Sequence, residues 1–538
     1  MTQALSTPDA ANEDTRTEDS PAGGRTRRAV PEIVRRRLAP PMPSLWVTWV
    51  ATFWITTIAA FVRVFHYGTP SEIMFDETYY ATEGQELLDH GVEWEPSSNT
   101  GAFVVHPPLG KWLIALGIKL LGNDSLGWRL PTVVLGIAAV AILTRTAIRM
   151  FRSVVLGAAA GLLMAFDGFE LVLSRIAILD IFVLFFVLAA FSCLVVDRDK
   201  RRQRWLRAME NGLDPTRPGR AGRPGFSWGG VPWWRLAAAL LLGLGCGVKW
   251  SVAFYLPMFL LLIVLWEVSL RRHAGVRRPW RDTLLDEFGW IAAFCVIVAG
   301  AYLATWTGWF LTDTGWKRHY LSAELGRTEL PVIGALQNLF YYHRDALGFH
   351  EGLVSKHPYQ SWPWQWLLLG RPVAIYYGND PSCGADDCSS VITLLGTPVL
   401  WWSFIPALVA MAWLGIARRD WRALAIGLGA ASGIVPWFWF HYADYRTMFY
   451  FYAAPAEPFL ILAVVFVLGA IINAPGVGFS GRTLTFAQSD RRLYGTIFAA
   501  AFLIAVALCF WYFYPIWTAQ SIPHDSWWQR MWLGNRWV

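Results

Sequence analysis

Two adjacent acids, Asp76 and Glu77, stand in the run FDETYY shortly after the first long apolar stretch of the chain. A positioned carboxylate can take the proton of a hydroxyl nucleophile, so this pair is a candidate for general-base catalysis. A simpler interpretation is helix capping, because Asp is a preferred N-cap residue and acids suit the first turn of a helix. The apolar spacing predicts a helix over residues 77–90 that ends at Gly91, with Asp76 at its start.

Neighbouring residues could complete a binding site around this pair. Tyr79 and Tyr80 follow directly and could line a sugar site, and the motif HPPLGK then supplies His106 and Lys111. This motif also has a structural interpretation, in which its prolines begin a helix, His106 caps it and Lys111 extends to the lipid headgroups. The sequence leaves both interpretations open.

A second candidate group consists of five basic residues at the ends of apolar stretches: Arg129, Arg175, Lys249, Arg371 and Arg446. Lys249 is the most informative, because it interrupts the apolar run LLLGLGCGVKWSVAFYL, and ionisable residues in such places usually face a polar cavity or a partner charge. The alternatives are extension of these side chains to the headgroups, or pairing with Asp167, Glu170 or Asp180. Together the five favour an anion site, since a phosphate attracts several cationic donors.

Other polar residues in or near the apolar stretches are weaker candidates. Asp180 could pair with Arg175 or form the floor of a cavity, and Glu457 is a second interior charge. The segment HPYQSWPWQW contributes His357 and Trp364 as candidates that line the substrate. Tryptophans of this kind also anchor loops at the water–lipid interface, which is the structural alternative.

The apolar stretches that must position these residues are typical of a membrane protein. Of 538 residues, 55% are hydrophobic and only 16% are charged. The apolar runs reach the roughly 20 residues that cross a bilayer, which predicts an all-α polytopic chain with about eleven transmembrane helices. They are expected near residues 45–66, 130–149, 153–170, 176–196, 233–249, 251–268, 287–308, 397–417, 421–440, 450–472 and 494–514.

Basic segments beside the spans predict the orientation of the chain. Clusters such as DRDKRRQRWLR and RRHAGVRRPWRD follow the pattern of cytoplasmic loops, so the net charge of +7 needs no nucleic-acid partner. The N-terminus is then cytoplasmic, and the C-terminus and both large loops, with their amphipathic helices, lie outside. The expected parts are a disordered tail, a transmembrane module with its first outer loop, a second outer loop, C-terminal helices and an outer tail: residues 1–44, 45–308 (loop 67–129), 309–396, 397–514 and 515–538.

Motifs for metals and nucleotides are missing from the sequence. It has no HExxH, no paired CxxC, no DxD and no GxxxxGK[ST], so a divalent cation is possible but has no motif. If the protein handles an activated sugar, the carrier is therefore expected to be a lipid. Of six cysteines, Cys383 and Cys388 share one polar loop, where a local disulfide is the alternative to two free thiols.

Eight segments in order resemble the protein O-mannosyltransferase family, which belongs to the GT-C class and to glycosyltransferase family 39. They are the DE pair, HPPLGK, WRLP, LSRIAILD, GVKW, HPYQSWPWQW, LLGTPVLWW and RTMFYFY, and the likeness is nearest to actinobacterial members. The resemblance implies a GT-C fold and inverting transfer of mannose from a polyprenyl-phosphate-mannose donor to Ser or Thr hydroxyls of secreted proteins. It also implies a plasma-membrane enzyme with an extracytoplasmic catalytic loop, working beside the protein translocation machinery.

The same resemblance implies roles for individual residues. Asp76 corresponds to the general base, and Glu77 supports the acceptor site. Arg129 matches an arginine needed for activity, and Lys249 is the candidate phosphate ligand. Further candidates for the donor phosphate are His106, Lys111, Arg175, Arg371 and Arg446. Eukaryotic members carry a β-trefoil (MIR) domain in the second outer loop, and here that loop is too short for one.

Two other functions remain as alternatives. A GT-C enzyme could move another lipid-linked sugar, or modify a lipid or glycan acceptor. A transporter of lipid-linked sugars is the other alternative, but transporters commonly show paired repeats, and the sequence shows none. The ionisable residues also gather at the predicted outer edge rather than at mid-membrane.

Overall fold

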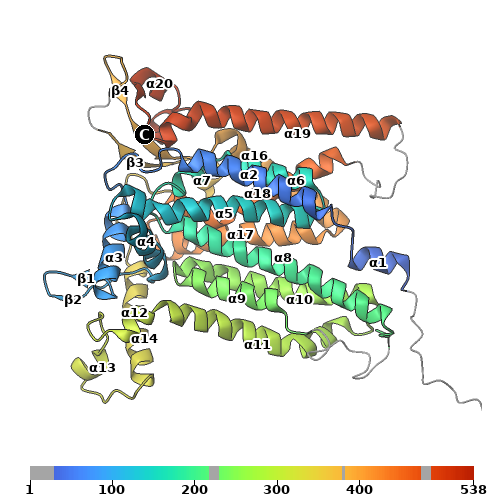
Figure 1. Ribbon diagram of the computed structural model, residues 1–538, viewed down its shortest axis with the longest axis horizontal. Helices are drawn as coiled ribbons and strands as arrows, with labels where there is room; N and C mark the ends of the chain where they lie inside the picture. Colours follow the sequence, from blue (N-terminus) through green and yellow to red (C-terminus); the bar gives the residue numbers. More distant parts are fainter. Residues whose placement is uncertain (1–29, 217–229, 379–381, 474–485) are drawn as a thin grey trace, which may run out of the picture.

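Helices that run side by side along the long axis of the molecule make up most of the protein (Figure 1). This computed structural model describes residues 30–216, 230–378, 382–473 and 486–538. Within these ranges nine helices are long and apolar enough to cross a membrane, one of them continuing from η2 (Trp250–Phe254) and one from η3 (Tyr450–Ala456). They are α2 (Leu45–Val64), α5 (Ser125–Phe151), α8 (Asp180–Glu210), α10 (Tyr255–Ala274), α11 (Pro279–Thr305), α16 (Pro398–Arg418), α17 (Trp421–Asp444), α18 (Glu457–Ile472) and α19 (Phe486–Phe513). The prediction of an all-α polytopic membrane protein is confirmed.

Two predicted spans form shorter helices than expected. The stretch 153–170 becomes α6 (Val154–Ala165) and, after a break, α7 (Gly168–Leu173). The break lies at Asp167, whose carboxylate accepts hydrogen bonds from the Thr397 amide at 2.7 Å and the Trp401 indole at 2.8 Å. The stretch 233–249 becomes α9 (Trp233–Cys246), because the chain reverses direction between α9 and η2.

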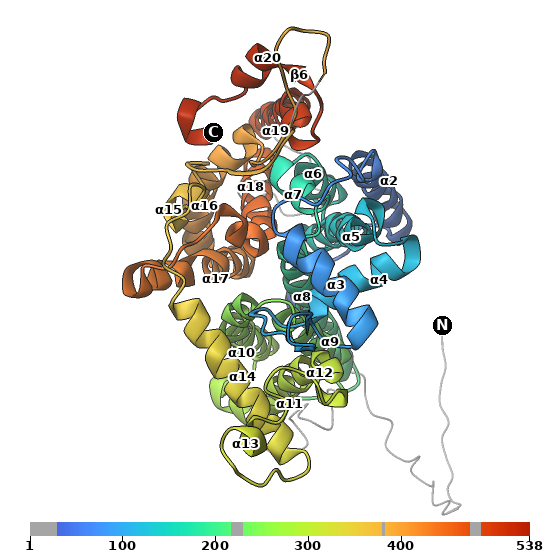
Figure 2. The same ribbon diagram turned by 90° about the vertical axis from the view of Figure 1, so that its left-hand side faces the viewer.

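One end of the bundle, at the left of Figure 1, is covered by short elements. Figure 2 looks onto this end and shows α3 and α14 lying across it. The helices of this cover are α3 (Glu77–His90), α4 (Leu109–Leu121), α12 (Thr307–Leu311), α13 (Tyr320–Ala323), α14 (Ile333–Glu351), α15 (Pro363–Trp366) and α20 (His524–Trp528), with η4 (Tyr514–Trp517) and η5 (Gly534–Trp537). We call this the cavity end and the opposite one the far end.

The helix predicted over residues 77–90 is confirmed as α3. It ends at Gly91, which has φ 79°, a left-handed conformation that glycine adopts without strain. Its buried face rests on α4, and Gly84 sits where the two helices cross, because a Cβ there would come within 3.2 Å of Ile114. The first outer loop is thus held by close packing of two helices.

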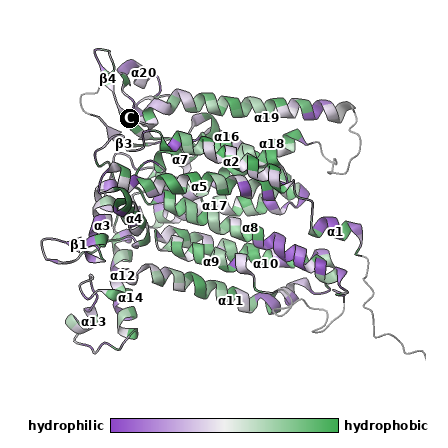
Figure 3. Ribbon diagram, in the orientation of Figure 1, coloured by the Kyte–Doolittle hydropathy of each residue, from purple (hydrophilic) through white to green (hydrophobic). Residues whose placement is uncertain are grey.

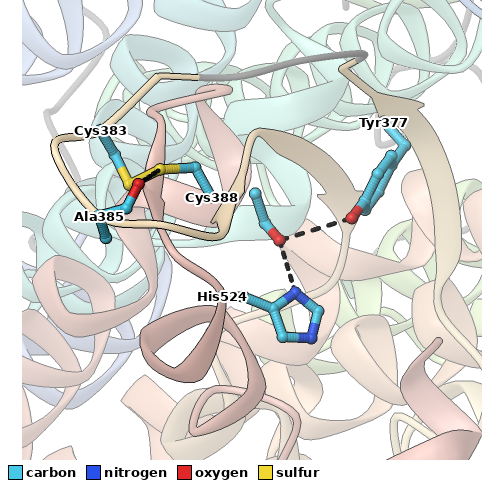
Figure 4. Close-up of a disulfide and its surroundings, with 6 residues drawn as sticks. Tyr377, Cys383, Ala385, Cys388 and His524 are labelled. Carbon is cyan, nitrogen blue, oxygen red and sulfur yellow. Dashed lines mark hydrogen bonds between the residues drawn. A yellow bond between two sulfur atoms is a disulfide. The ribbon is translucent and has the colours of Figure 1, made fainter.

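Three small antiparallel sheets tie the covering segments together. They pair β1 (Trp94–Glu95) with β2 (Thr100–Gly101), β3 (Val373–Tyr377) with β5 (Val391–Leu394), and β4 (Cys388–Ser389) with β6 (Ile522–Pro523). Of the two alternatives for Cys383 and Cys388, the structure has the disulfide, which closes the loop before β4 (Figure 4). Beside it, the Ser389 hydroxyl lies 2.9 Å from His524 Nδ1, which joins this loop to the C-terminal segment.

The predicted disordered tail, residues 1–44, is wrong in its last part. Residues 32–38 form α1 (Glu32–Leu38), and Leu38 is buried in a small apolar cluster with Trp205 and Leu270. The segment has many basic residues and few apolar ones, and for this reason the sequence predicted disorder. Burial of Leu38 in the apolar cluster nevertheless holds the helix in place. Residues 1–29 lie outside the described part of the chain.

Candidate active site

A cavity of about 220 Å³ lies between the bundle and the cover at the cavity end. Its walls mix aromatic rings with charged and imidazole side chains. The polar and charged residues that line it are His106, Asp180, Lys249, Ser251, His350 and Arg446, and its apolar wall includes Val183, Trp250, Phe254, Leu347, Trp437, Phe440, Tyr452 and Pro455. This composition suits a ligand with an apolar part and an anionic part.

Asp76 occupies the N-cap position of α3, but its side chain caps nothing. No hydrogen bond from the carboxylate to the first turn is found in the described structure. The preceding residue, Phe75, has φ 48°, a strained backbone conformation for a residue other than glycine, and its ring packs edge-on against Phe451. The capping interpretation therefore explains the position of Asp76 and leaves its carboxylate available.

Lys249 lies in the tight turn between α9 and η2, with its side chain in the cavity wall. Its ammonium donates to Asp180 Oδ2 at 2.7 Å, and it lies 5.5 Å from the centre of the Phe451 ring. Of the partners considered from the sequence, Asp180 is the one realised. Asp180 is in the first turn of α8, so both charges lie at the cavity end of the bundle.

The charges of Lys249 and Asp180 act on Asp76. Burial raises the pKa of Asp76 to about 6, the positive charge of Lys249 opposes this rise, and the negative charge of Asp180 adds to it. Two carboxylates near one ammonium cannot both be fully neutralised by it. Asp76 therefore has the protonation behaviour of a general base that works near neutral pH.

Two imidazoles and a guanidinium also line the cavity. Arg446 donates from Nη1 to the His350 carbonyl at 2.6 Å, and its Nε is buried without a hydrogen-bond partner. The rings of His106 and His350 are 5.5 Å apart. Burial, with the charge of Arg446, lowers the pKa of His350 to about 4, and burial with Lys249 lowers the pKa of His106 well below its usual range. Both imidazoles are thus neutral hydrogen-bonding groups at pH 7.

His350 is the site residue that sequence reasoning missed. It lies near the end of α14 in the second outer loop, and no motif marks it there. His106, by contrast, was a candidate, and the structure shows that it does not cap α4: the N-cap residue is Pro108, and no side chain caps that helix. No sequence signal marks His350, because its place beside His106 depends on how α14 packs across the end of the bundle.

Glu77 and Arg129 do not line the cavity. They form a buried ion pair in which Arg129 Nε and Nη2 each lie 2.7 Å from an oxygen of Glu77. Arg129 also donates to the carbonyls of Pro70 and Glu72, and Glu77 accepts from the amide of Ala177. This pair fixes the start of α3 against α5 and so positions Asp76. The contacts predicted for Glu77 with the acceptor and for Arg129 with the donor stay predictions.

Lys111 is likewise paired within the protein rather than extended to headgroups. It is fully buried between Glu93 and Glu83, and the latter is 3.3 Å from its ammonium. Burial, with Glu93 nearby and Lys111 opposing it, raises the pKa of Glu83 to about 7. Tyr80 is buried with its ring 6.3 Å from His106, whereas Tyr79 is 63% exposed.

The remaining predicted residues lie at the same end but outside the cavity wall. Arg175 donates to the His66 carbonyl at 2.7 Å, and Arg371 donates to the carbonyls of Arg536 and Val538. The imidazole of His357 packs against Phe449 at 5.0 Å between ring centres, and that of His441 packs against Trp364 at 5.1 Å. Of the five outer cations, the structure brings Lys249 and Arg446 to one cavity.

No metal cluster is evident at this site. In residues 30–216, 230–378, 382–473 and 486–538, no three His, Cys, Asp or Glu side chains are grouped as a metal would require. The charges available in the cavity wall are instead an ammonium and a guanidinium. Such an arrangement can hold an anion, while Asp76 beside it can accept a proton.

A solved structure with the same architecture identifies the fold. The S. cerevisiae protein O-mannosyltransferase Pmt1–Pmt2 complex bound to the sugar donor matches with a TM-score of 0.67, covering 94% of each chain at 14% sequence identity. The fold is therefore that of the GT-C glycosyltransferases, membrane enzymes with a helical bundle. The predicted fold class is confirmed.

Sequence relatives identify the family. The chain is 37% identical to the polyprenol-phosphate-mannose–protein mannosyltransferase of Mycolicibacterium smegmatis, over 90% of this chain and 92% of that one, and also 37% identical to that of Mycobacterium tuberculosis, over 90% and 91%. The Corynebacterium glutamicum protein of the same name is 31% identical over 92% and 95%. Two family profiles match as well, a dolichyl-phosphate-mannose-protein mannosyltransferase region at residues 105–210 and a C-terminal four-transmembrane region of protein O-mannosyltransferases at 335–537. The chain belongs to the protein O-mannosyltransferase family and is a glycosyltransferase.

Proposed function

We propose that this enzyme transfers mannose from a polyprenyl-phosphate-mannose donor to Ser or Thr hydroxyls of exported proteins, with Asp76 as the general base. One observation carries the assignment of the base. The Asp76 carboxylate caps no helix and lies within electrostatic reach of Lys249 and Asp180 at the cavity. The family relationship supplies the sugar and the carrier, because the named relatives are polyprenol-phosphate-mannose–protein mannosyltransferases.

The proposed reaction is a single displacement. Asp76 takes the proton of the acceptor hydroxyl, the hydroxyl oxygen forms a bond to the anomeric carbon, and the bond from that carbon to the phosphate oxygen breaks. The electron pair of the broken bond stays on the departing lipid phosphate. One base on the attacking side and cations on the leaving side fit inversion, because a retaining enzyme needs a nucleophilic carboxylate against the anomeric carbon.

Lys249 and Arg446 are the proposed ligands of the departing phosphate. An ammonium has three donors, and Asp180 accepts from Lys249. Arg446 keeps a buried Nε without a partner, which a phosphate oxygen would satisfy. Fixed cations at the point where negative charge develops lower the barrier without reorganisation.

These cations occupy the role that a divalent metal has at phosphates in other transferases. We therefore expect transfer that persists in the presence of EDTA. Neutral His106 and His350 add hydrogen bonds rather than charge. The proposed specificity of the leaving-group site thus rests on protein side chains.

The proposed location is the cell membrane, with the cavity end outside and the N-terminus inside. Hydrophilic residues gather at the far end of α8, α10 and α11 (Figure 3), which is the pattern of the cytoplasmic side. Acceptors would then reach the cavity as unfolded segments emerging from the translocation machinery. Access from that side suits hydroxyls of extended Ser- and Thr-rich segments.

A transfer assay in membranes tests the assignment of the base. Labelled polyprenyl-phosphate-mannose and a Ser- and Thr-rich peptide serve as substrates for the wild type, Asp76→Asn and Asp89→Asn. The last is the matched control, because Asp89 is an exposed acid on the same helix. We expect Asp76→Asn to lower the rate by about 10²–10⁴ while the protein accumulates normally, and Asp89→Asn to be fully active. Full activity of Asp76→Asn would remove Asp76 from the mechanism.

A further inference from the structure

An excess of positive charge lies around α8 at the far end, between α5 on one side and α10 and the start of α17 on the other. Five arginines form what we call the arginine cluster: Arg145, Arg149, Arg152, Arg198 and Arg202. Within the described residues one carboxylate, Asp199, makes ion pairs with them, at 2.7 Å from Arg152, 3.3 Å from Arg198 and 3.4 Å from Arg149. Asp420 and Glu267 also act electrostatically on Arg198 and Arg202, but Asp420 is paired with Arg422, and Glu267 is paired with three other arginines. The guanidinium groups of the cluster therefore outnumber the carboxylates that can neutralise them.

Two of these arginines are deeply buried with unused donors. Arg198 is 8% and Arg202 is 5% exposed, and the Nε atom of each is buried without a hydrogen-bond partner. The Nη1 atom of Arg145 is also buried without a hydrogen-bond partner, and its guanidinium lies 4.1 Å from the ring centre of Trp49. Arg198 also stacks on Trp421 at 3.5 Å, but this contact leaves its Nε donor unused. A buried donor without a partner is unfavourable, so an added anion would stabilise the cluster.

Adjacent residues on α8 show that burial of arginine does not by itself produce this excess. Arg201 belongs to a different group, the far-end network, in which three arginines meet four acids: Asp197, Arg201, Arg235, Glu267, Arg271, Asp286 and Glu287. Arg202, one residue further, donates to the Arg37 carbonyl and the Ser269 hydroxyl, each at 3.2 Å. Neighbouring positions of one helix thus belong to a set in which the acids match or outnumber the arginines and to a set in which the arginines outnumber the acids.

The cluster lies at the depth of lipid headgroups. Asp199 is about 28 Å along α8 from Asp180, which is close to the ~30 Å thickness of a hydrocarbon core. It also opens toward lipid, because α2 beside it exposes Trp46 and Trp49 at 75% and 53%. Acyl chains could lie along these rings while a phosphate meets the guanidinium groups of Arg149 and Arg152, whose side chains are 24% and 15% exposed.

We propose that the arginine cluster binds the phosphate headgroup of an anionic phospholipid in the leaflet at the far end. Arg149 and Arg152 form the entrance, and Arg198 and Arg202 supply the buried charge behind it. Arginine suits this role, because its fork of donors matches phosphate oxygens. A bound lipid would link α5, α8 and α2 at the end of the molecule opposite the cavity.

Lipid titration of the purified full-length protein in nonionic detergent tests this proposal. Phosphatidylglycerol or phosphatidylcholine is added, and the dissociation constant is obtained from the shift in Tm. We expect phosphatidylglycerol to bind at least tenfold more tightly, and the double variant Arg149→Gln/Arg152→Asn to weaken it by about tenfold to thirtyfold. Asn is used at 152 because this residue has φ 55°.

The matched control is Arg418→Gln/Arg419→Asn. It removes the same two charges from the end of α16, where Arg419 also has φ 50° and both side chains are exposed. Phosphatidylglycerol binding should be unchanged there. Equal losses in the two double variants would show only general surface attraction and would overturn the proposal, as would equal binding of the two lipids.

Two further measurements keep the result interpretable. Asp199→Asn removes the one ion-paired carboxylate, so it should tighten phosphatidylglycerol binding several-fold, whereas loss of a merely structural ion pair would weaken it. Inorganic phosphate at millimolar concentration should not displace the lipid. Displacement would assign the site to a soluble anion and overturn the lipid assignment.

Discussion

Buried charges occur at both ends of the helix bundle, in the far-end network and around the cavity. In the far-end network Arg235 binds Asp197, Glu267 and Glu287 at 2.6 to 2.9 Å, so its donors are used within the protein. At the cavity, the Asp76 carboxylate caps nothing and the Nε of Arg446 is unpartnered. The difference teaches that the same residue types hold a structure together where their hydrogen bonds are filled, and are available for chemistry where they are not.

Breaking the far-end network should give the largest loss of stability. Arg235→Gln removes one cation and leaves buried carboxylates unpaired, which should lower the free energy of unfolding by about 3–5 kcal/mol. Thermal unfolding of the purified protein measures this, with the exposed Arg277→Gln as the control at the same end. A stable Arg235→Gln protein that lacks transfer activity would break the comparison, because it would give the network a catalytic role.

Removing the cavity cation should instead affect the reaction. Lys249→Gln is expected to lower the transfer rate by about 10²–10³, the loss typical of one donor at a developing negative charge. Its Tm should fall by less than that of Arg235→Gln, because Asp180 faces a cavity that water can enter. The transfer assay and thermal unfolding are compared with Lys119→Gln, an exposed lysine of α4. Unfolding without any separate loss of rate would show that Lys249 is structural.

The pH dependence of transfer sharpens the difference further. Only ionised Asp76 accepts a proton, so kcat/KM should fall about tenfold per pH unit below a pKa of about 6 and level off above it. An ordinary aspartate would place this inflection two units lower. Glu83 titrates near pH 7, so Glu83→Gln is the control that must leave the inflection unchanged.

The smallest effect is expected for Arg371, an outer cation whose hydrogen-bond donors are already used within the protein. Arg371 donates to the carbonyls of Pro358, Arg536 and Val538, so Arg371→Gln should change transfer by less than about threefold and stability by about 1 kcal/mol. Initial rates against donor concentration measure the first and Tm the second. A hundredfold rise in the KM for donor would place Arg371 in the donor site after all.

Local patterns in the sequence predicted the elements of the site well. The helix over residues 77–90 and its end at Gly91 both follow from residue types that act within a few positions. The disulfide between Cys383 and Cys388 is equally local. Such local features form as the sequence predicts, because neighbouring residues alone determine them.

Pairing across long separations was not predictable in the same way. Glu77 looked like a substrate residue beside Asp76, but its carboxylate is used by Arg129, which is 52 positions away. His350 carried no motif, and its place opposite His106 depends on how α14 crosses the end of the bundle. Residue type identifies candidates, whereas packing of helices decides which of them meet.

By itself the sequence determined the membrane class, the family and a small set of acids and cations with the right chemistry. The length of the apolar runs and the distribution of basic residues are properties of whole segments, so they can be recognised from the sequence alone. Only the tertiary structure decided that Asp76 keeps its carboxylate unused while Glu77 does not, and that Lys249 and Arg446 share one cavity. The physical reason is that a buried charge is defined by its partners, and those partners come from distant helices.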